Sequence, residues 1–96
     1  MSYEARPVCI FYDTDRKSYG LYQSGEHPKP VVFTGRTLDS VMGGIKEWHW
    51  LFRSNEISFA LPKIWDKQDF KAIEDDQKEP IVKRLGKLGY AIVEQN

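Results

Sequence analysis

Apolar residues recur every three or four positions across residues 37–54, a spacing that is typical of an amphipathic helix. When each residue turns about 100° around the axis, one stripe contains Leu38, Val41, Met42, Ile45, Trp48 and Phe52. Thr37 precedes this stripe and carries a side-chain oxygen suited to an N-cap. The pattern therefore predicts one long helix that packs on the rest of the domain through the stripe.

Two adjacent glycines, Gly43 and Gly44, interrupt the predicted helix near its middle. Each costs about 1 kcal/mol relative to alanine in a helix interior. We expect either the close approach of a neighbouring backbone or a kink at this point.

Trp50 does not belong to the apolar stripe. On the helical wheel it lies about 140° from Ile45, and its neighbours there are Asp39, Gly43 and Glu47. Leu51 lies about 120° from Ile45 on the other side, and His49 lies only about 40° away, so we expect His49 to be partly buried. A large aromatic side chain on a polar face indicates that another surface covers it, in the same chain or in a partner.

Five segments have the composition of β-strands. Residues 8–12 are uniformly apolar, as in a strand covered on both faces, and residues 19–23 follow a polar turn as the second strand of a hairpin. Residues 31–33 and 90–93 are short apolar runs. Residues 56–61 alternate between apolar and polar positions, which predicts a strand with one wet or lightly covered face.

Two short helices are predicted in the second half of the chain. Trp65 and Phe70 flank Asp66 as in a hydrophobic staple, with Asp66 as the N-cap of a helix over residues 67–75. Pro80 is a favoured first helical residue, and a second helix would extend from it to Gly89. The apolar stripe of that helix contains Ile81, Leu85 and Leu88.

The expected fold is a single α+β domain over residues 1–96, with the element order β-β-β-α-β-α-α-β. A single mixed sheet of about five strands would carry the long helix on one face. The two short helices would cover the other face, which would explain the uniformly apolar first and last strands.

Composition narrows the function classes. The chain has 96 residues, 14 basic and 14 acidic side chains and no formal net charge, so it lacks the positive excess of a dedicated duplex binder. Lys83, Arg84 and Lys87 fit a solvated helix face, and nucleic acid is not an expected partner. The single cysteine, Cys9, lies in an apolar run and is expected to be a buried, inert thiol. No segment suggests a signal peptide or a membrane span, so we expect a cytoplasmic protein without a membrane partner.

Residues 8–15 end an apolar strand in Asp-Thr-Asp, and residues 31–35 end a second one in Thr-Gly. This pattern resembles the first two motifs of haloacid dehalogenase-type phosphotransferases. The resemblance implies that Asp13 is the nucleophile, Asp15 the general acid and Thr34 a phosphate contact, beside a magnesium ion. The chain contains no helix between these two strands to connect them in parallel. Asp-Thr-Asp is also common in turns, where aspartate side chains bond to their own backbone.

A second resemblance covers residues 8–54. A hairpin with the aromatic-glycine pair Tyr19 and Gly20, a short strand, and a helix opened by TGRTLDS are similar to the amino-terminal domain of HicB-type antitoxins. The resemblance implies binding to a small RNA-cleaving toxin, with a DNA-binding segment behind the domain. The Pro-Gly-Cys region of that family is missing before the third strand, and the carboxy-terminal portion has no recognisable DNA-binding motif.

No zinc-ligand spacing and no glycine-rich phosphate loop is present in the sequence. We therefore expect a small protein-binding module that acts without a cofactor and without catalysis, as a homodimer or as an inhibitor or adaptor of a larger complex. The expected contact residues are Trp50, Leu51, Glu47, Gly43 and Asp39. A symmetric homodimer through this face is the simplest form of the hypothesis.

Overall fold

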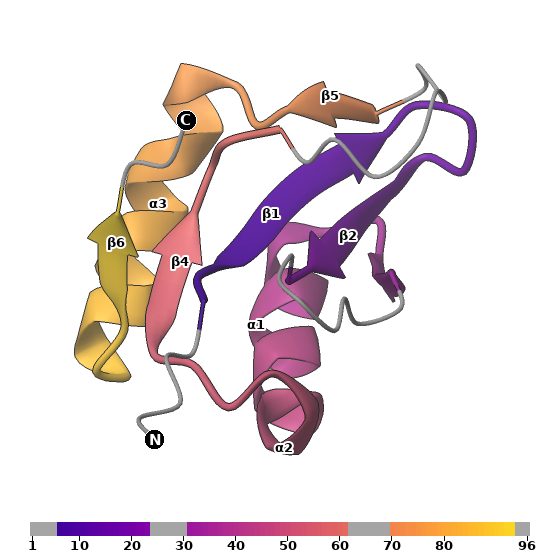
Figure 1. The fold of residues 1–96 in the computed structure, drawn as a ribbon. Coiled ribbons are helices and arrows are strands. Elements are labelled where there is room, and N and C mark those ends of the chain that lie inside the picture. The colour runs from indigo at the N-terminus through magenta and orange to yellow at the C-terminus, as the bar shows by residue number, and fades with distance from the viewer. Residues whose placement is uncertain (1–5, 24–30, 62–69, 94–96) are drawn as a thin grey trace.

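The computed structural model describes residues 6–23, 31–61 and 70–93. The strands in these ranges are β1 (Val8–Asp13), β2 (Ser18–Tyr22), β3 (Val32–Gly35), β4 (Glu56–Ser58), β5 (Phe70–Ala72) and β6 (Ala91–Val93). The helices are α1 (Leu38–Glu47), α2 (His49–Phe52) and α3 (Asp75–Lys87). All the strands join one mixed sheet, which confirms the expected α+β class (Figure 1).

Strand β1 is the centre of the sheet, in the order β3-β2-β1-β4-β6. Its partner β2 runs antiparallel to it, as the predicted hairpin requires. On its other edge, β1 pairs with two strands in succession: β4 is parallel to it at Val8 and Cys9, and β5 is antiparallel to it at Phe11–Asp13. Strand β6 extends the sheet beyond β4, in parallel.

Both long helices pack on the same face of the sheet, so the prediction that they cover opposite faces is wrong. Buried side chains of α1 and α3 join a single core with those of β1 and β2, and an ion pair between Asp39 and Arg84 connects the two helices. The core contains Val8, Ile10, Tyr19, Leu21, Val32, Val41, Ile45, Phe52, Ile57, Ile73, Ile81 and Leu85.

The other face of β1 is covered by aromatic rings instead of helices. The Phe11 ring is fully buried, and its centroid lies 4.4 Å from that of Phe70 and 6.5 Å from that of Phe33. It also lies over Gly20, its cross-strand partner, where a Cβ atom would come within 2.6 Å of the ring. Strand β1 is therefore buried on both faces, as its uniformly apolar sequence predicts.

The predicted helix over residues 37–54 is divided at Trp48, whose backbone (φ −99°, ψ 11°) separates α1 from α2. The N-cap prediction is confirmed, because the Thr37 side chain accepts a hydrogen bond from the Ser40 N–H. The structure explains one of the two glycines, Gly44. A Cβ atom at this position would lie 2.8 Å from the Cβ of Thr34 on β3. Close packing is therefore the reason at Gly44, whereas a Cβ at Gly43 would meet open space.

The second half of the chain departs most from the prediction. Residues 70–72 form β5 and not the end of a helix, while Trp65 and Asp66 lie outside the described residues. Pairing with β1 therefore overrides the local staple pattern. Helix α3 begins at Asp75, well before Pro80, and the observed order becomes β-β-β-α-α-β-β-α-β. The acidic residues Asp75 and Asp76 favour this earlier start because they lie at the positive end of the helix dipole.

Two strand predictions also need correction. Strand β4 ends at Ser58 and does not continue to residue 61 as predicted. Ser58 is fully buried, so the expected wet or lightly covered face is absent at this position, and Leu61 beyond the strand is 45% exposed. Strand β6 is not covered on both faces, because Ala91 and Ile92 are exposed. It is an outer strand of the sheet.

Candidate protein-contact surface around Trp50

A buried side chain and backbone hydrogen bonds attach the one-turn helix α2 to the core. Phe52 is buried, and its carbonyl accepts a hydrogen bond of 2.9 Å from the buried side-chain amide of Gln23. The same Gln23 nitrogen also donates to the carbonyl of Arg6. The turn ends at Arg53 in the left-handed region (φ 50°), where its N–H bonds to the His49 carbonyl. These contacts hold the turn in place at the end of α1.

Trp50 extends from this turn and is 64% exposed, the largest exposed fraction among the exposed large hydrophobic residues of the described ranges. Its ring is supported by Trp48, which is half-buried and packs against the core. The two ring centroids lie 5.9 Å apart at an interplanar angle of 36°. The chain therefore supports one edge of the Trp50 side chain and leaves most of it uncovered.

A shallow hollow lies beside the exposed ring. It is lined by His49, Trp50, Arg53, Ser54 and Asn55. The Arg53 side chain donates from Nε to the Trp50 carbonyl at 3.3 Å, and it forms no ion pair with the described residues. The hollow thus combines an indole ring with an unneutralised guanidinium. We call these five residues the Trp50 surface.

The predicted contact residues do not all share this surface. Leu51 is half-buried and packs against the core, so it does not lie off the core as the wheel suggested. Asp39 is exposed but forms the ion pair with Arg84 of α3. Gly43 and Glu47 are exposed on α1, and neither lines the hollow.

The break at Trp48 accounts for Leu51, because the wheel of α1 does not continue unchanged past Trp48. His49 is exposed instead of partly buried for the same reason. Sequence reasoning also missed Arg53, Ser54 and Asn55, which follow the helical segment. Their placement depends on the left-handed backbone at Arg53, and that conformation is uncommon for a residue other than glycine.

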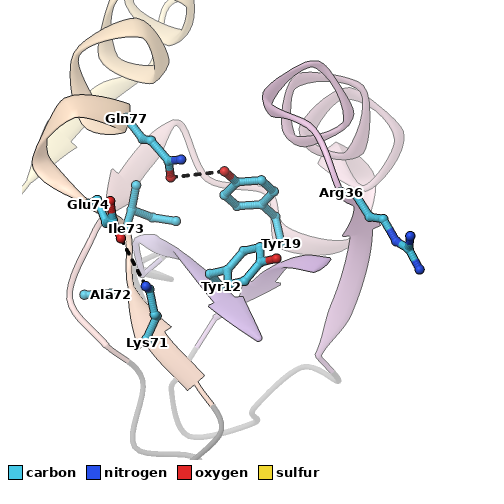
Figure 2. Close-up of a pocket in the computed structure, with 8 residues that line it drawn as sticks. All are labelled: Tyr12, Tyr19, Arg36, Lys71, Ala72, Ile73, Glu74 and Gln77. Carbon is cyan, nitrogen blue, oxygen red and sulfur yellow. Dashed lines mark hydrogen bonds and ion pairs between the residues drawn. The ribbon is translucent and has the colours of Figure 1, made fainter. Parts of the chain in front are cut away.

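A second hollow, of about 290 Å³, lies between the sheet and the first turn of α3. Figure 2 shows that Gln77 extends from α3 toward Tyr19, while Arg36 points away from the other side chains. The Tyr19 hydroxyl donates to the Gln77 Oε1 atom at 3.1 Å, and Lys71 forms an ion pair of 3.1 Å with Glu74. Most of the polar groups here are paired with one another. The hydrogen bond connects α3 with β2, and the ion pair connects β5 with the residue that precedes α3.

The Tyr19 side chain is buried beside this second hollow. Burial raises the pKa of its phenol, and electrostatic interactions with Tyr12, Glu74 and Asp76 raise it further. A protonated hydroxyl is the form that can donate to Gln77.

The Asp-Thr-Asp segment forms a turn. The Asp13 Oδ1 atom accepts hydrogen bonds from the N–H groups of Asp15 (2.9 Å) and Arg16 (3.1 Å), which is the backbone bonding expected of aspartate in a turn. Thr34 lies on β3, which β2 separates from β1, and its hydroxyl donates to the Tyr19 carbonyl. The structure therefore does not place Thr34 beside Asp13 as the phosphotransferase resemblance implies.

Cys9 is buried, as predicted, and burial raises the pKa of its thiol, an effect that a hydrogen bond with Ser58 partly opposes. Within residues 6–23, 31–61 and 70–93, no three His, Cys, Asp or Glu side chains lie close enough together to hold a metal ion. In the same ranges, each helix is too short or too polar to cross a membrane.

No protein-family model matches the chain, and comparisons with curated proteins and with solved structures likewise gave no match. The functional argument therefore rests on the geometry of the chain itself.

Proposed function

We propose that this chain is a small protein-binding module that acts without catalysis through the Trp50 surface. The observation that carries the proposal is the 64% exposure of Trp50 on a turn held by buried groups. Tryptophan and arginine are enriched among the residues that dominate the energetics of protein interfaces. The Trp50 surface offers both residue types side by side.

Covering the Trp50 ring would contribute substantially to the free energy of binding. A Trp side chain carries about 250 Å² of surface, so an exposure of 64% leaves about 160 Å² to be buried by a partner. At about 25 cal/mol per Å², this area corresponds to about 4 kcal/mol before the costs of association are subtracted. The turn is already ordered, which keeps the ordering part of those costs low.

The charge of the Trp50 surface favours a different protein over a second copy. A two-fold axis through Trp50 would bring Arg53 of each copy close to its equivalent, and like charges at an interface are unfavourable. We therefore infer a partner segment that places an apolar side chain on the indole and a carboxylate beside Arg53.

The HicB-like hypothesis is compatible with this proposal. The antiparallel strands β1, β2 and β3 followed by α1 agree with the element order on which that resemblance rests. A toxin would then be the protein partner.

The experiment compares wild type with Trp50→Ala and with Lys46→Ala, a matched control at an exposed position of α1. A partner is first captured with the wild-type chain, identified and purified, and its dissociation constant is then measured for all three proteins. We expect Trp50→Ala to weaken binding by about 30-fold, the effect of a loss of about 2 kcal/mol, and Lys46→Ala to have little effect. Equal affinities of wild type and Trp50→Ala would contradict the proposal.

A further inference from the structure

No strand among the described residues pairs with the outer edge of β6. Within the described residues, β6 pairs only with β4, and the Ala91 N–H donates to the Asn55 carbonyl at 2.8 Å. Because backbone groups alternate in direction along a strand, the N–H and C=O groups of Ile92 point away from β4. The strand Ala91–Val93 contains no charged residue or proline that would discourage pairing with another strand.

The apolar layer between the sheet and α3 is also open at this edge. Ile92 pairs in register with Ile57, so the two side chains lie on the same face of the sheet. Ile57 is fully buried, but Ile92 is 36% exposed because β6 is the last strand of the sheet in the part of the chain that the structure describes. Val82 on α3, which is 39% exposed, adds apolar surface.

One side of α3 faces in the direction of this edge. Arg84 marks the side of the helix that faces α1, since it forms the ion pair with Asp39 of α1. Val82 and Gly86 each lie about 160° around the helix from Arg84, on the side away from α1. A Cβ at Gly86 would meet no atom within 4 Å, so another helix could approach closely there. Figure 1 shows β6 and α3 together at one lateral end of the molecule.

The charges along α3 are complementary to those of an antiparallel copy of the same helix. Glu79 lies about 20° and Lys83 about 60° around the helix from Gly86, so both flank the side of α3 that faces the β6 edge. Neither side chain forms an ion pair with the described residues of its own chain. In an antiparallel pair centred on Val82, Glu79 of each helix would lie close to Lys83 of the other.

We propose that a second copy of this chain docks at the β6 edge. The two β6 strands pair antiparallel about Ile92 and join the two sheets into one, while the two α3 helices pack at Val82 and Gly86. A single two-fold axis relates both contacts, because antiparallel strands and antiparallel helices obey the same symmetry. This dimer does not involve the Trp50 surface, and it presents two copies of that surface to partners.

The test is the mass in solution of the isolated chain over a range of concentrations, by light scattering and sedimentation. We expect wild type to reach twice the monomer mass. Ile92→Pro removes the outward N–H without changing the inward bonds of β6, and we expect it to stay monomeric at concentrations where wild type is dimeric. Ile92→Ala is the matched control: it shortens the side chain but keeps the N–H, so its dissociation constant should rise by only about tenfold.

Two oppositely charged variants at Val82 test the same dimer even if Ile92→Pro does not fold. Val82→Lys and Val82→Glu each place like charges together at the two-fold axis, so each alone should be monomeric. An equimolar mixture of the two should recover the dimer mass. The proposal is overturned if wild type is a monomer at all concentrations, or if a dimer persists in both Val82 variants. A dimer lost only in Trp50→Ala would place the second copy at the Trp50 surface instead.

Discussion

The inner and outer sides of the α1–α2 segment use the same residue types for opposite purposes. Gly44 and Phe52 face inward, where one lies against Thr34 of β3 and the other is buried in the core. Gly43 and Trp50 are close to them in sequence but face outward, into open space. The role of a glycine or an aromatic residue in a helical segment therefore depends on whether it faces the core or the solvent.

The aromatic pair gives the largest expected contrast. Phe52→Ala should lower the free energy of unfolding by about 3–5 kcal/mol, because it leaves a cavity in the core. Trp50→Ala should lower it by less than about 1 kcal/mol, since most of the ring is already in water. Urea unfolding of both variants measures the contrast. A loss of 3 kcal/mol or more in Trp50→Ala would assign Trp50 to the core.

Alanine substitutions at Gly44 and Gly43 should change the free energy of unfolding by smaller amounts and in opposite directions. Gly44→Ala should destabilise the fold by about 1–3 kcal/mol, because its Cβ would overlap Thr34. Gly43→Ala meets open space and should stabilise the fold by up to about 1 kcal/mol through helix propensity. Thermal unfolding of the two variants checks both signs. If the two variants had equal effects, the close contact between α1 and β3 would be in doubt.

The local sequence pattern was sufficient to predict those parts of the fold that local contacts determine. The stripe through Val41, Ile45 and Phe52 predicted the buried side of the segment, and Trp50 was correctly placed off that stripe. The hairpin of β1 and β2 followed from a polar turn between two apolar runs.

Long-range pairing and helix termini were beyond the same reasoning. Strand β5 forms because it pairs with β1, more than 50 residues earlier in the chain, and no local signal records that partner. Arg53 and Asn55 line the hollow beside Trp50 only because the helical segment breaks at Trp48 and ends in a left-handed turn. The wheel found the exposed ring but not the polar residues around it.

The central claim is that the Trp50 ring is left uncovered by its own chain so that another protein can cover it. Hydroxyl-radical footprinting with mass spectrometry measures this most directly, in the free chain and in the chain saturated with its captured partner. The account predicts that Trp50 is readily oxidised in the free chain and strongly protected in the complex, while half-buried Trp48 changes less. Equal oxidation of Trp50 with and without the bound partner would contradict the account.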